Sequence, residues 1–306
     1  MTDSPRPQRI LGLPRTTVAI MAMVCGAACL AANHALVRSV ADEVGALETS
    51  ALRFLWAVPL ILPWLLRNRG ELLRTRRHGM HFLASAVTVL STTSLFAGLA
   101  LMPMAFVTSL SFTAPLFTTV MAIFMFRERV DAARWAATLI GFAGVLIILR
   151  PGVAPFQPAA ILPLVYAFVY ALWFLMMKRL GQTESTTTIT IYQTLWSALL
   201  LTLIALPEWQ TPSWEAVWRS AAMGLLGTSA IFLVARAFDM AEASLLAPFD
   251  YIRLPMIAII AFLAFSEVPD LFTVVGALVI IGATLYSARR GARSAAKLDS
   301  HGHGTG

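Results

Sequence analysis

Ala-Pro-Leu-Phe-Thr-Thr-Val-Met-Ala-Ile-Phe-Met-Phe-Arg-Glu, residues 114–128, is an apolar run with a proline near its start and a glutamate at its end. A second run, residues 254–267, follows the same plan. Pro115 matches Pro255, the closing glutamates match as well, and each run leads into an apolar segment that contains glycines. The sequence therefore predicts an internal repeat.

Apolar runs of this kind fill most of the chain. Of its 306 residues, 58% are hydrophobic and 13% are charged, whereas soluble domains have about 45–50% apolar and about 25% charged residues. A bilayer core needs ~20 apolar residues per helical span. The expected fold is an all-α membrane protein with ten transmembrane helices, at about 17–37, 48–66, 80–101, 104–126, 132–149, 158–177, 187–206, 216–238, 244–265 and 270–288.

The basic residues predict which ends of the spans face the cytoplasm, where Lys and Arg collect. With the N-terminus inside, eighteen of the 23 basic residues fall in cytoplasmic segments. The outer connections hold Arg38, Arg150 and Arg219, and two more arginines lie within spans. Both termini are therefore expected in the cytoplasm. This distribution also argues against a basic patch for nucleic acid.

Each repeat contains five spans, an odd number, so the two repeats must have opposite orientations in the membrane. The expected organisation is a tail at 1–16, a first repeat at 17–149, an inverted second repeat at 158–288 and a tail at 289–306. The charges agree with this arrangement, because the turn that holds Glu128 is flanked by arginines whereas residues 266–270, around Glu267, contain no Lys or Arg.

Charged residues inside spans are the first candidates for a binding site, since each costs about 2.5–3.5 kcal/mol on insertion scales. Asp250 and Arg253 are three residues apart on one helix, close enough for a local ion pair. The pair is either structural or available to a zwitterionic solute. Arg53 either binds the solute or extends to the outer headgroups or Glu48. His34, beside Asn33, is either a proton-coupling residue or a hydrogen-bonded interface residue.

Aromatic residues line two of the expected helices. Tyr166, Tyr170 and Trp173 share one helical face, and Tyr192 and Trp196 share another. Such faces are either packing surfaces or walls that stack on a flat or cationic solute. The full expected binding set consists of Asn33, His34, Arg53, Trp56, Tyr166, Tyr170, Trp173, Tyr192, Gln193, Asp250, Tyr251 and Arg253.

Prolines inside the spans remove backbone hydrogen bonds and can kink helices. Pro115 and Pro255 occupy equivalent repeat positions, which favours a hinge in both repeats. Glycines such as Gly144 and Gly276 are expected to let neighbouring helices approach closely.

The sequence contains no nucleophile, metal or nucleotide motif typical of an intramembrane enzyme or an ATP-driven pump. His78 and His81 are three apart but have no adjacent acidic residue, so they are expected at a solvated helix end rather than at a metal. Neither a metal nor a cofactor is expected. A channel stays open as an alternative because Ser91, Thr92 and their neighbours make the third span polar.

These features resemble the drug/metabolite transporter superfamily, specifically its EamA-type members with two five-helix repeats. The resemblance rests on Arg53-Phe54, on 103–105 through Pro115 to Glu128, and on 241–251 through Glu267. The Ala-Pro-Phe-Asp-Tyr stretch at 247–251 is similar to the branch with S-adenosylmethionine and riboflavin transporters. The resemblance implies gradient-linked exchange or efflux through a central cavity.

The expected function is secondary transport of a small zwitterionic or amphipathic metabolite across a bacterial inner membrane. Amino-acid derivatives and amino-acid-based metal chelators suit the charged and aromatic set better than sugars do. Export is the first expectation, and import or exchange of S-adenosylmethionine or a vitamin such as riboflavin is the alternative. The expected partners are the solute, the bilayer and a coupling proton or counter-solute; the sequence leaves the oligomeric state open, a homodimer included.

Overall fold

The computed structural model of the chain describes residues 9–10, 13–67, 74–126, 132–150, 157–240, 246, 249 and 252–302. Two short strands, β1 (Arg9–Ile10) and β2 (Leu13–Pro14), pair in antiparallel fashion ahead of the first helix. The rest of the described part is dominated by helices: α1 (Arg15–Arg67), α2 (His78–Leu101), α3 (Met104–Ser111), α4 (Ala114–Phe126), α5 (Ala132–Leu149), α6 (Ile161–Leu180), α7 (Thr186–Ala205), α8 (Trp214–Met240), α10 (Arg253–Phe265) and α11 (Leu271–Gly302), with short 3₁₀ turns at Pro158–Ala160 and Leu206–Glu208.

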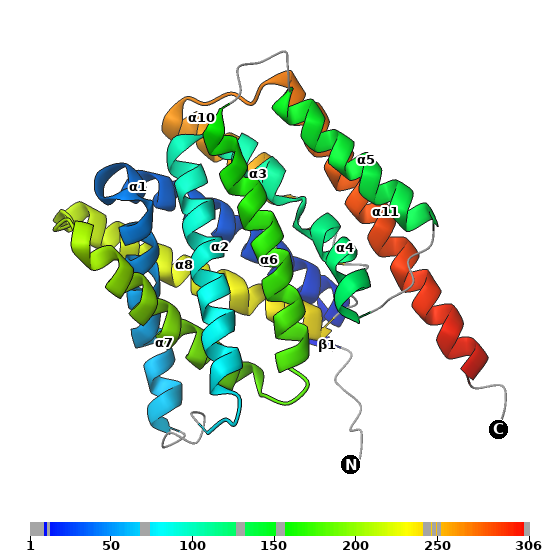
Figure 1. Ribbon diagram of the computed structural model, residues 1–306, viewed down its shortest axis with the longest axis horizontal. Helices are drawn as coiled ribbons and strands as arrows, with labels where there is room; N and C mark the ends of the chain where they lie inside the picture. Colours follow the sequence, from blue (N-terminus) through cyan, green and yellow to red (C-terminus); the bar gives the residue numbers. More distant parts are fainter. Residues whose placement is uncertain are drawn as a thin grey trace.

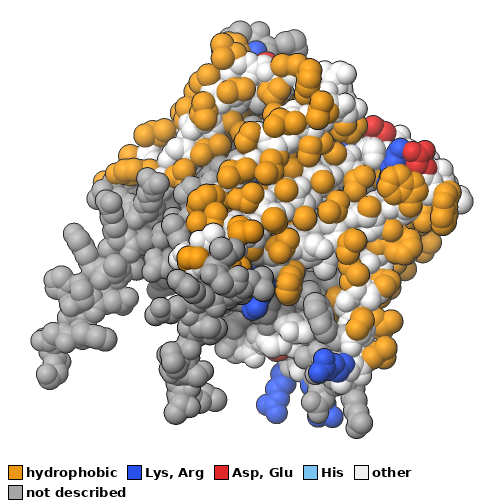
Figure 2. All heavy atoms as spheres, turned by 180° about the vertical axis from the view of Figure 1, so that it is seen from behind, with side chains coloured by type: hydrophobic (Ala, Val, Ile, Leu, Met, Phe, Trp, Pro, Cys, Tyr) orange, Lys and Arg blue, Asp and Glu red, His pale blue; other side chains and the backbone are white. Residues whose placement is uncertain are grey.

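The helices have the composition that a bilayer requires, which confirms the all-α membrane class. Within the described residues, six helical segments are long and apolar enough to cross a membrane; one of them is Met104–Met121, in which α3 and the start of α4 follow each other across a short turn. The apolar segments Trp135–Leu149, Arg253–Phe265 and Leu271–Tyr286 are shorter. Figure 2 shows hydrophobic side chains spread over most of one face, with Lys and Arg gathered mainly near its lower edge.

Helix α1 contains the first two expected spans, joined at Gly45. This glycine has φ 81° and ψ 163°, a left-handed conformation that only glycine adopts readily. The chain is kinked there, so residues 15–44 and 46–67 form two helical halves. The first half continues past residue 37, where the first span was expected to end.

The expected span 104–126 is broken, not continuous. Helix α3 ends at Ser111, and α4 begins at Ala114 after a turn in which the Thr113 hydroxyl donates to the Leu110 carbonyl at 2.7 Å. Pro115 is the second residue of α4 and Pro255 is the third residue of α10. In a first helical turn the missing proline N–H has no helical partner to lose. Both prolines therefore lie in the first turns of helices, and the hinges expected there stay a prediction.

Helices α5 and α11, the last helices of the two expected repeats, lie side by side at one flank of the bundle (Figure 1). Their backbones approach at two glycines. A Cβ on Gly144 would lie 2.9 Å from the Gly276 carbonyl oxygen, and a Cβ on Gly276 would lie 2.7 Å from that of Gly144. The close packing expected of these glycines is thus present.

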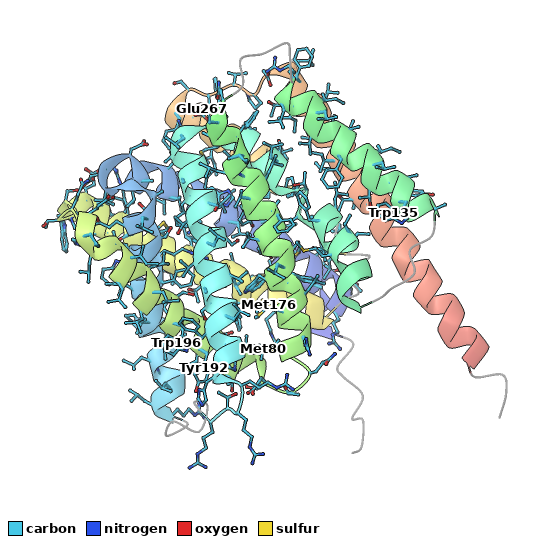
Figure 3. The ribbon with its side chains drawn as sticks, in the orientation of Figure 1. Met80, Trp135, Met176, Tyr192, Trp196 and Glu267 are labelled. Atoms are coloured by element: carbon cyan, nitrogen blue, oxygen red, sulfur yellow. The ribbon has the colours of Figure 1, made fainter. Side chains whose placement is uncertain are left out.

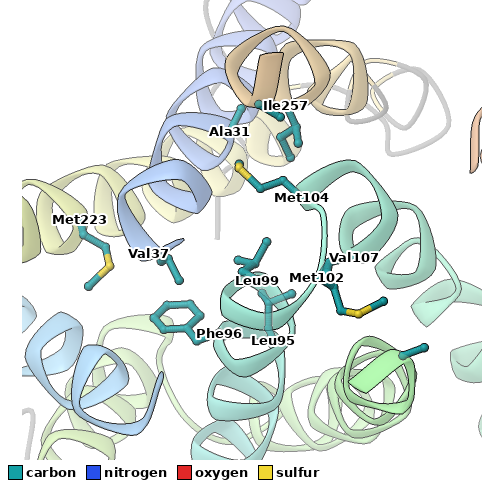
Figure 4. Packing of buried hydrophobic residues seen from close by; sticks show 12 residues of the cluster. Ala31, Val37, Leu95, Phe96, Leu99, Met102, Met104, Val107, Met223 and Ile257 are labelled. Carbon is teal, nitrogen blue, oxygen red and sulfur yellow. The ribbon is translucent and has the colours of Figure 1, made fainter. Parts of the chain in front are cut away.

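The largest buried cluster lies where helices of both repeats meet. Figure 4 shows side chains of α1, α2, α3, α8 and α10 converging. Val37, Leu99, Met104, Met223 and Ile257 all belong to this cluster and have no exposed surface. The remaining members with 8% exposure or less are Ala31, Leu95, Phe96, Met102, Val107, Ala160 and Ala261.

Hydrogen bonds join the connections between helices at each of the two ends of the bundle. At the end expected in the cytoplasm, the Thr75 hydroxyl donates to Glu184 at 2.5 Å. At the opposite end, Glu43 and Glu48 accept hydrogen bonds from the backbone N–H groups of Ser213 and Gln210 at 2.8 and 2.9 Å. The connections that the charge pattern places on one side thus contact each other.

Candidate functional site

The centre of the candidate site is a polar contact between α1 and α8. The Asn33 side-chain amide donates to the Met223 carbonyl at 2.7 Å and is buried. A methyl group added to Gly227, one turn further along α8, would lie 3.4 Å from Asn33 Nδ2 and 3.2 Å from Arg53 Nε. Because Gly227 has no side chain, the Asn33 amide and the Arg53 guanidinium can lie close to α8 at this position.

Arg53 comes from the second half of α1 and is half-buried. Its guanidinium carbon lies 5.1 Å from the Phe54 ring and 5.8 Å from the Phe96 ring of α2. It also interacts electrostatically with Tyr166 of α6. The sequence suggested Glu48 as one partner for Arg53. In the structure, Glu48 accepts a hydrogen bond from the backbone N–H of Gln210. Arg53 thus contacts the aromatic rings of Phe54 and Phe96.

A second guanidinium approaches from α10. The Arg253 guanidinium carbon lies 5.0 Å from the ring of Phe112, in the break between α3 and α4. Buried His34 interacts electrostatically with both Arg253 and Arg53. The start of α10 therefore contacts the turn between α3 and α4.

The aromatic face expected on α6 is a ladder of rings. Tyr166 and Tyr170 have ring centroids 5.5 Å apart at 33°, and Tyr170 stacks on Trp173 at 5.2 Å and 30°. Because Tyr166 also interacts with Arg53, this ladder begins at the charged cluster and runs away from it along α6. Tyr170 keeps 37% of its surface exposed.

Trp56 lies one turn after Arg53 on the same half of α1. Its indole N–H donates to the Ser220 hydroxyl at 2.9 Å, and a Cβ on Gly224 would lie 2.8 Å from Trp56 Cβ. Trp56 therefore packs on α8, and 37% of its surface stays exposed.

Tyr192 and Gln193 lie apart from this cluster. Tyr192 is buried between α2 and α7, with its hydroxyl 3.3 Å from His78 Nδ1, and Gln193 donates to Thr88 at 3.0 Å. Figure 3 shows Tyr192 and Trp196 towards the lower end of the bundle, opposite Glu267.

The structure corrects the expectation for His81. This side chain has no exposed surface and stacks on Tyr192 with ring centroids 4.5 Å apart, whereas a solvated helix end was expected. Helix α7 covers the start of α2, and the sequence of α2 alone gives no sign of that neighbour. Asp250 and Tyr251 lie outside the described residues.

Three ion pairs at the end opposite Tyr192 went unrecognised in the sequence. They join Arg38 to Glu267, Arg150 to Asp270 and Arg219 to Glu215. Each arginine expected on the outside is thus paired with a carboxylate. The signal was available, because the repeat pattern had already singled out Glu267 and the charge count had singled out the three arginines.

Asp270 is fixed by two elements at once. It accepts the Thr273 N–H at 2.8 Å at the start of α11, and it pairs with Arg150 at the end of α5. Burial alone would raise the pKa of the Asp270 carboxyl, but the Thr273 hydrogen bonds and the Arg150 guanidinium outweigh burial and lower that pKa below its usual value. Asp270 therefore remains an anion near neutral pH.

The central cluster suits recognition of an anionic group. Guanidinium groups bind carboxylates in a planar, bidentate manner, and Arg53 and Arg253 both interact with His34. Aromatic rings flank both guanidiniums. Within the described part, Asn33, His34, Arg53, Tyr166 and Arg253 are brought together out of the expected set.

Comparison with known proteins identifies the family. The EamA-like transporter family matches the chain twice, over residues 17–150 and 157–289. An S-adenosylmethionine uptake transporter of Rickettsia felis is 30% identical over 255 residues, which cover 83% of this chain and 87% of that protein. A riboflavin transporter of Vibrio cholerae is 35% identical over 229 residues, which cover 74% of this chain and 76% of that protein.

A more distant relative is named for the opposite direction of movement. A pseudopaline exporter of Pseudomonas aeruginosa is 25% identical over 239 residues, which cover 75% of this chain and 82% of that protein. Because the family matches most of the chain in two copies, and relatives at 30% identity or more extend over more than two thirds of it, this multi-pass membrane protein belongs to the EamA-like transporter family of the drug/metabolite transporter superfamily.

Proposed function

We propose that the chain is a secondary transporter that binds a small zwitterionic metabolite at the central cluster and moves it by alternating access. The observation that carries the proposal is a pair of guanidiniums, Arg53 and Arg253, that lie over aromatic rings and both interact electrostatically with buried His34. The solute carboxylate binds the guanidiniums, and its flat part stacks on the ladder that begins at Tyr166. Asp250 is proposed to bind the solute amine.

The proposed topology has ten spans in two inverted repeats, both termini in the cytoplasm and the bacterial inner membrane as location. Support comes from the two family matches and from the broken segment 112–113, which faces Arg253 at the start of α10. Interrupted helices at the interface of inverted repeats are typical of transporter binding sites.

The proposed solute class is an amino-acid derivative with a flat ring, such as S-adenosylmethionine or a compound of similar charge. Two relatives are named for S-adenosylmethionine and for riboflavin, both of which contain flat heteroaromatic rings. The cationic and aromatic cluster suits such a solute better than a sugar, which would need many neutral hydrogen-bonding groups.

Export is the first candidate direction and uptake is the second. A relative named as an exporter supports the first, and a relative named for uptake supports the second. If the chain exports, a deletion strain accumulates the solute inside and releases less of it. Reduced uptake with unchanged internal and released levels assigns import instead.

Counterflow in proteoliposomes tests the function itself. Vesicles preloaded with one unlabelled solute should accumulate the same labelled solute transiently, with saturable rates, for at least one amino-acid derivative in a panel that includes S-adenosylmethionine, riboflavin and a sugar. Flux without saturation or counterflow would indicate a channel and contradict the proposal. Runs with and without a pH gradient separate proton coupling from solute exchange.

A further inference from the structure

The Arg38–Glu267 pair joins the two repeats at the end of the bundle opposite Tyr192. Arg38 is in the first half of α1, and it pairs with Glu267 in the connection between α10 and α11. The other carboxylate oxygen of Glu267 accepts the Met104 N–H at the start of α3 at 3.0 Å. One side chain of the second repeat thus holds two elements of the first.

Arg38 has further contacts that fix its position. Its guanidinium lies 4.9 Å from the Phe265 ring at the end of α10, and Nη1 is 3.4 Å from the Met102 carbonyl. The Arg38 and Glu267 side chains are only 20% and 17% exposed. The pair is therefore shielded enough to be stronger than a surface ion pair, yet it is not fully buried and can be broken by competing charges.

The central cluster lies directly beneath this pair. His34 is one helical turn before Arg38, about 6 Å along the α1 axis. Three side chains without exposed surface lie next to the pair or to Arg253: Val37 precedes Arg38 on α1, Met104 donates its N–H to Glu267, and Ile257 follows Arg253 by one turn on α10. All three belong to the large apolar cluster (Figure 4). We call these three side chains the apolar layer.

A cavity of about 290 Å³ lies beside the pair. Its lining includes the apolar residues Phe106 and Ala261 and the charged residues Arg150, Glu267 and Asp270. That volume is at the lower end of the range of small-molecule sites. Glu267 therefore contacts both the cavity and Arg38.

We propose that Glu267 is the latch of the outer gate and that the cavity is an outer vestibule for a solute that carries a cation. This inference rests on the proposed transport function. While Glu267 holds Arg38 and α3, the apolar layer closes the route between the vestibule and the central cluster. A solute ammonium or sulfonium group in the vestibule competes with Arg38 for the carboxylate, which releases α1 and opens the layer.

The test measures access to the layer rather than transport. Val37→Cys is introduced after Cys25→Ala and Cys29→Ala, and a membrane-impermeant maleimide is added to right-side-out and to inverted vesicles. Glu267→Gln should raise the labelling rate from the outer side about tenfold, because Gln keeps an acceptor for the Met104 N–H but loses the charge that holds Arg38.

Three further variants separate gating from damage to the fold. Arg38→Gln should give the same increase, and the double variant should label no faster than either single variant, since both remove one interaction. Glu215→Gln is the matched control, because it also removes a carboxylate paired with an arginine, Arg219, and both residues of that pair lie in α8. Its labelling rate should equal that of the parent.

Equal rates for Glu267→Gln, Arg38→Gln and the control would overturn the latch. So would multiplicative effects in the double variant. Labelling needs no solute, so the two proposals can fail separately. If the variants label as expected but counterflow is absent, only the proposed function is contradicted. Unchanged labelling alongside normal counterflow contradicts the latch alone. S-adenosylmethionine serves as the sulfonium probe and should accelerate labelling of the parent from the outer side. If it does not, its cation does not compete with Arg38 for Glu267.

Discussion

Arg53 illustrates how a charge can be placed within a membrane protein. A charged residue at the centre of a span costs about 2.5–3.5 kcal/mol on insertion scales. The Phe54 and Phe96 rings offset part of this cost, since a cation over an aromatic face gains about 0.5–2 kcal/mol. Gly227 adds room for the guanidinium. The remaining cost is consistent with a group kept for binding.

Gly227→Ala tests this placement without removing any charge. The added methyl would crowd Arg53 Nε and Asn33 Nδ2 at 3.2 and 3.4 Å, so the guanidinium should shift and KM for solute should rise about fivefold to tenfold. Helix stability should not fall, because alanine favours a helix over glycine by about 1 kcal/mol.

Gly282→Ala is the control for that substitution, because nothing lies within 4 Å of the position where its Cβ would be. Its KM should match that of the parent. If Gly227→Ala also leaves KM unchanged, Arg53 and Asn33 do not contact the solute from their present positions.

The sequence was informative about residue type and less so about residue neighbours. Arg53, His34 and Arg253 stand out because charged or ionisable groups in apolar runs are costly, and the structure brings them together. Gly227 and Phe112 gave no such signal, since their importance depends on contacts across the bundle. Tyr192 was selected as an aromatic residue that could stack on the solute, but its ring stacks on His81. Helical periodicity identifies the face on which a residue lies and not the residue that packs against that face.

At the scale of helices, α5 and α11 depend on close backbone contact. Lipid provides no hydrophobic drive for two apolar helices to associate, so contact between small residues has to hold them together. Gly144 and Gly276 supply that contact, and each already lies against the backbone of the other helix.

Gly276→Val should therefore separate the two helices. Its Cβ would lie 2.4 Å from Ile148 Cγ1 and 2.7 Å from the Gly144 carbonyl, an overlap that should destabilise the protein by roughly 1–3 kcal/mol. Thermal unfolding in detergent measures the loss. Gly282→Val, on the same helix but free of such contacts, should have little effect; equal losses would show that the cost arises from valine in the helix itself.

The internal repeat could be predicted from the sequence, but the break between α3 and α4 could not. Matching prolines and glutamates suggested equivalent positions, and Pro115 and Pro255 do lie in the first turns of α4 and α10. The interruption at 112–113 could not be predicted from hydropathy, because the residues on both sides are apolar and the turn relies on the bond from Thr113 to Leu110.

At the scale of the molecule, the distribution of charge predicts the orientation in the membrane. Eighteen of the 23 basic residues lie on one expected side, and each outer arginine is paired with a carboxylate. A reporter fused after Ser300 should fluoresce as a cytoplasmic protein and show no periplasmic phosphatase activity. The reverse pattern would invert the topology and assign the Arg38–Glu267 pair to the inner side.

Counterflow by Arg53→Gln in proteoliposomes tests whether the central cluster binds the solute, with Arg219→Gln as a control that removes an arginine outside that cluster. If Arg53 binds the solute, Arg53→Gln should reduce counterflow at least about a hundredfold, since a charge-assisted bidentate contact contributes about 3 kcal/mol, while the variant inserts and unfolds like the parent. Arg219→Gln should transport normally. Normal counterflow by correctly inserted Arg53→Gln would show that the charge is structural and that the solute binds elsewhere.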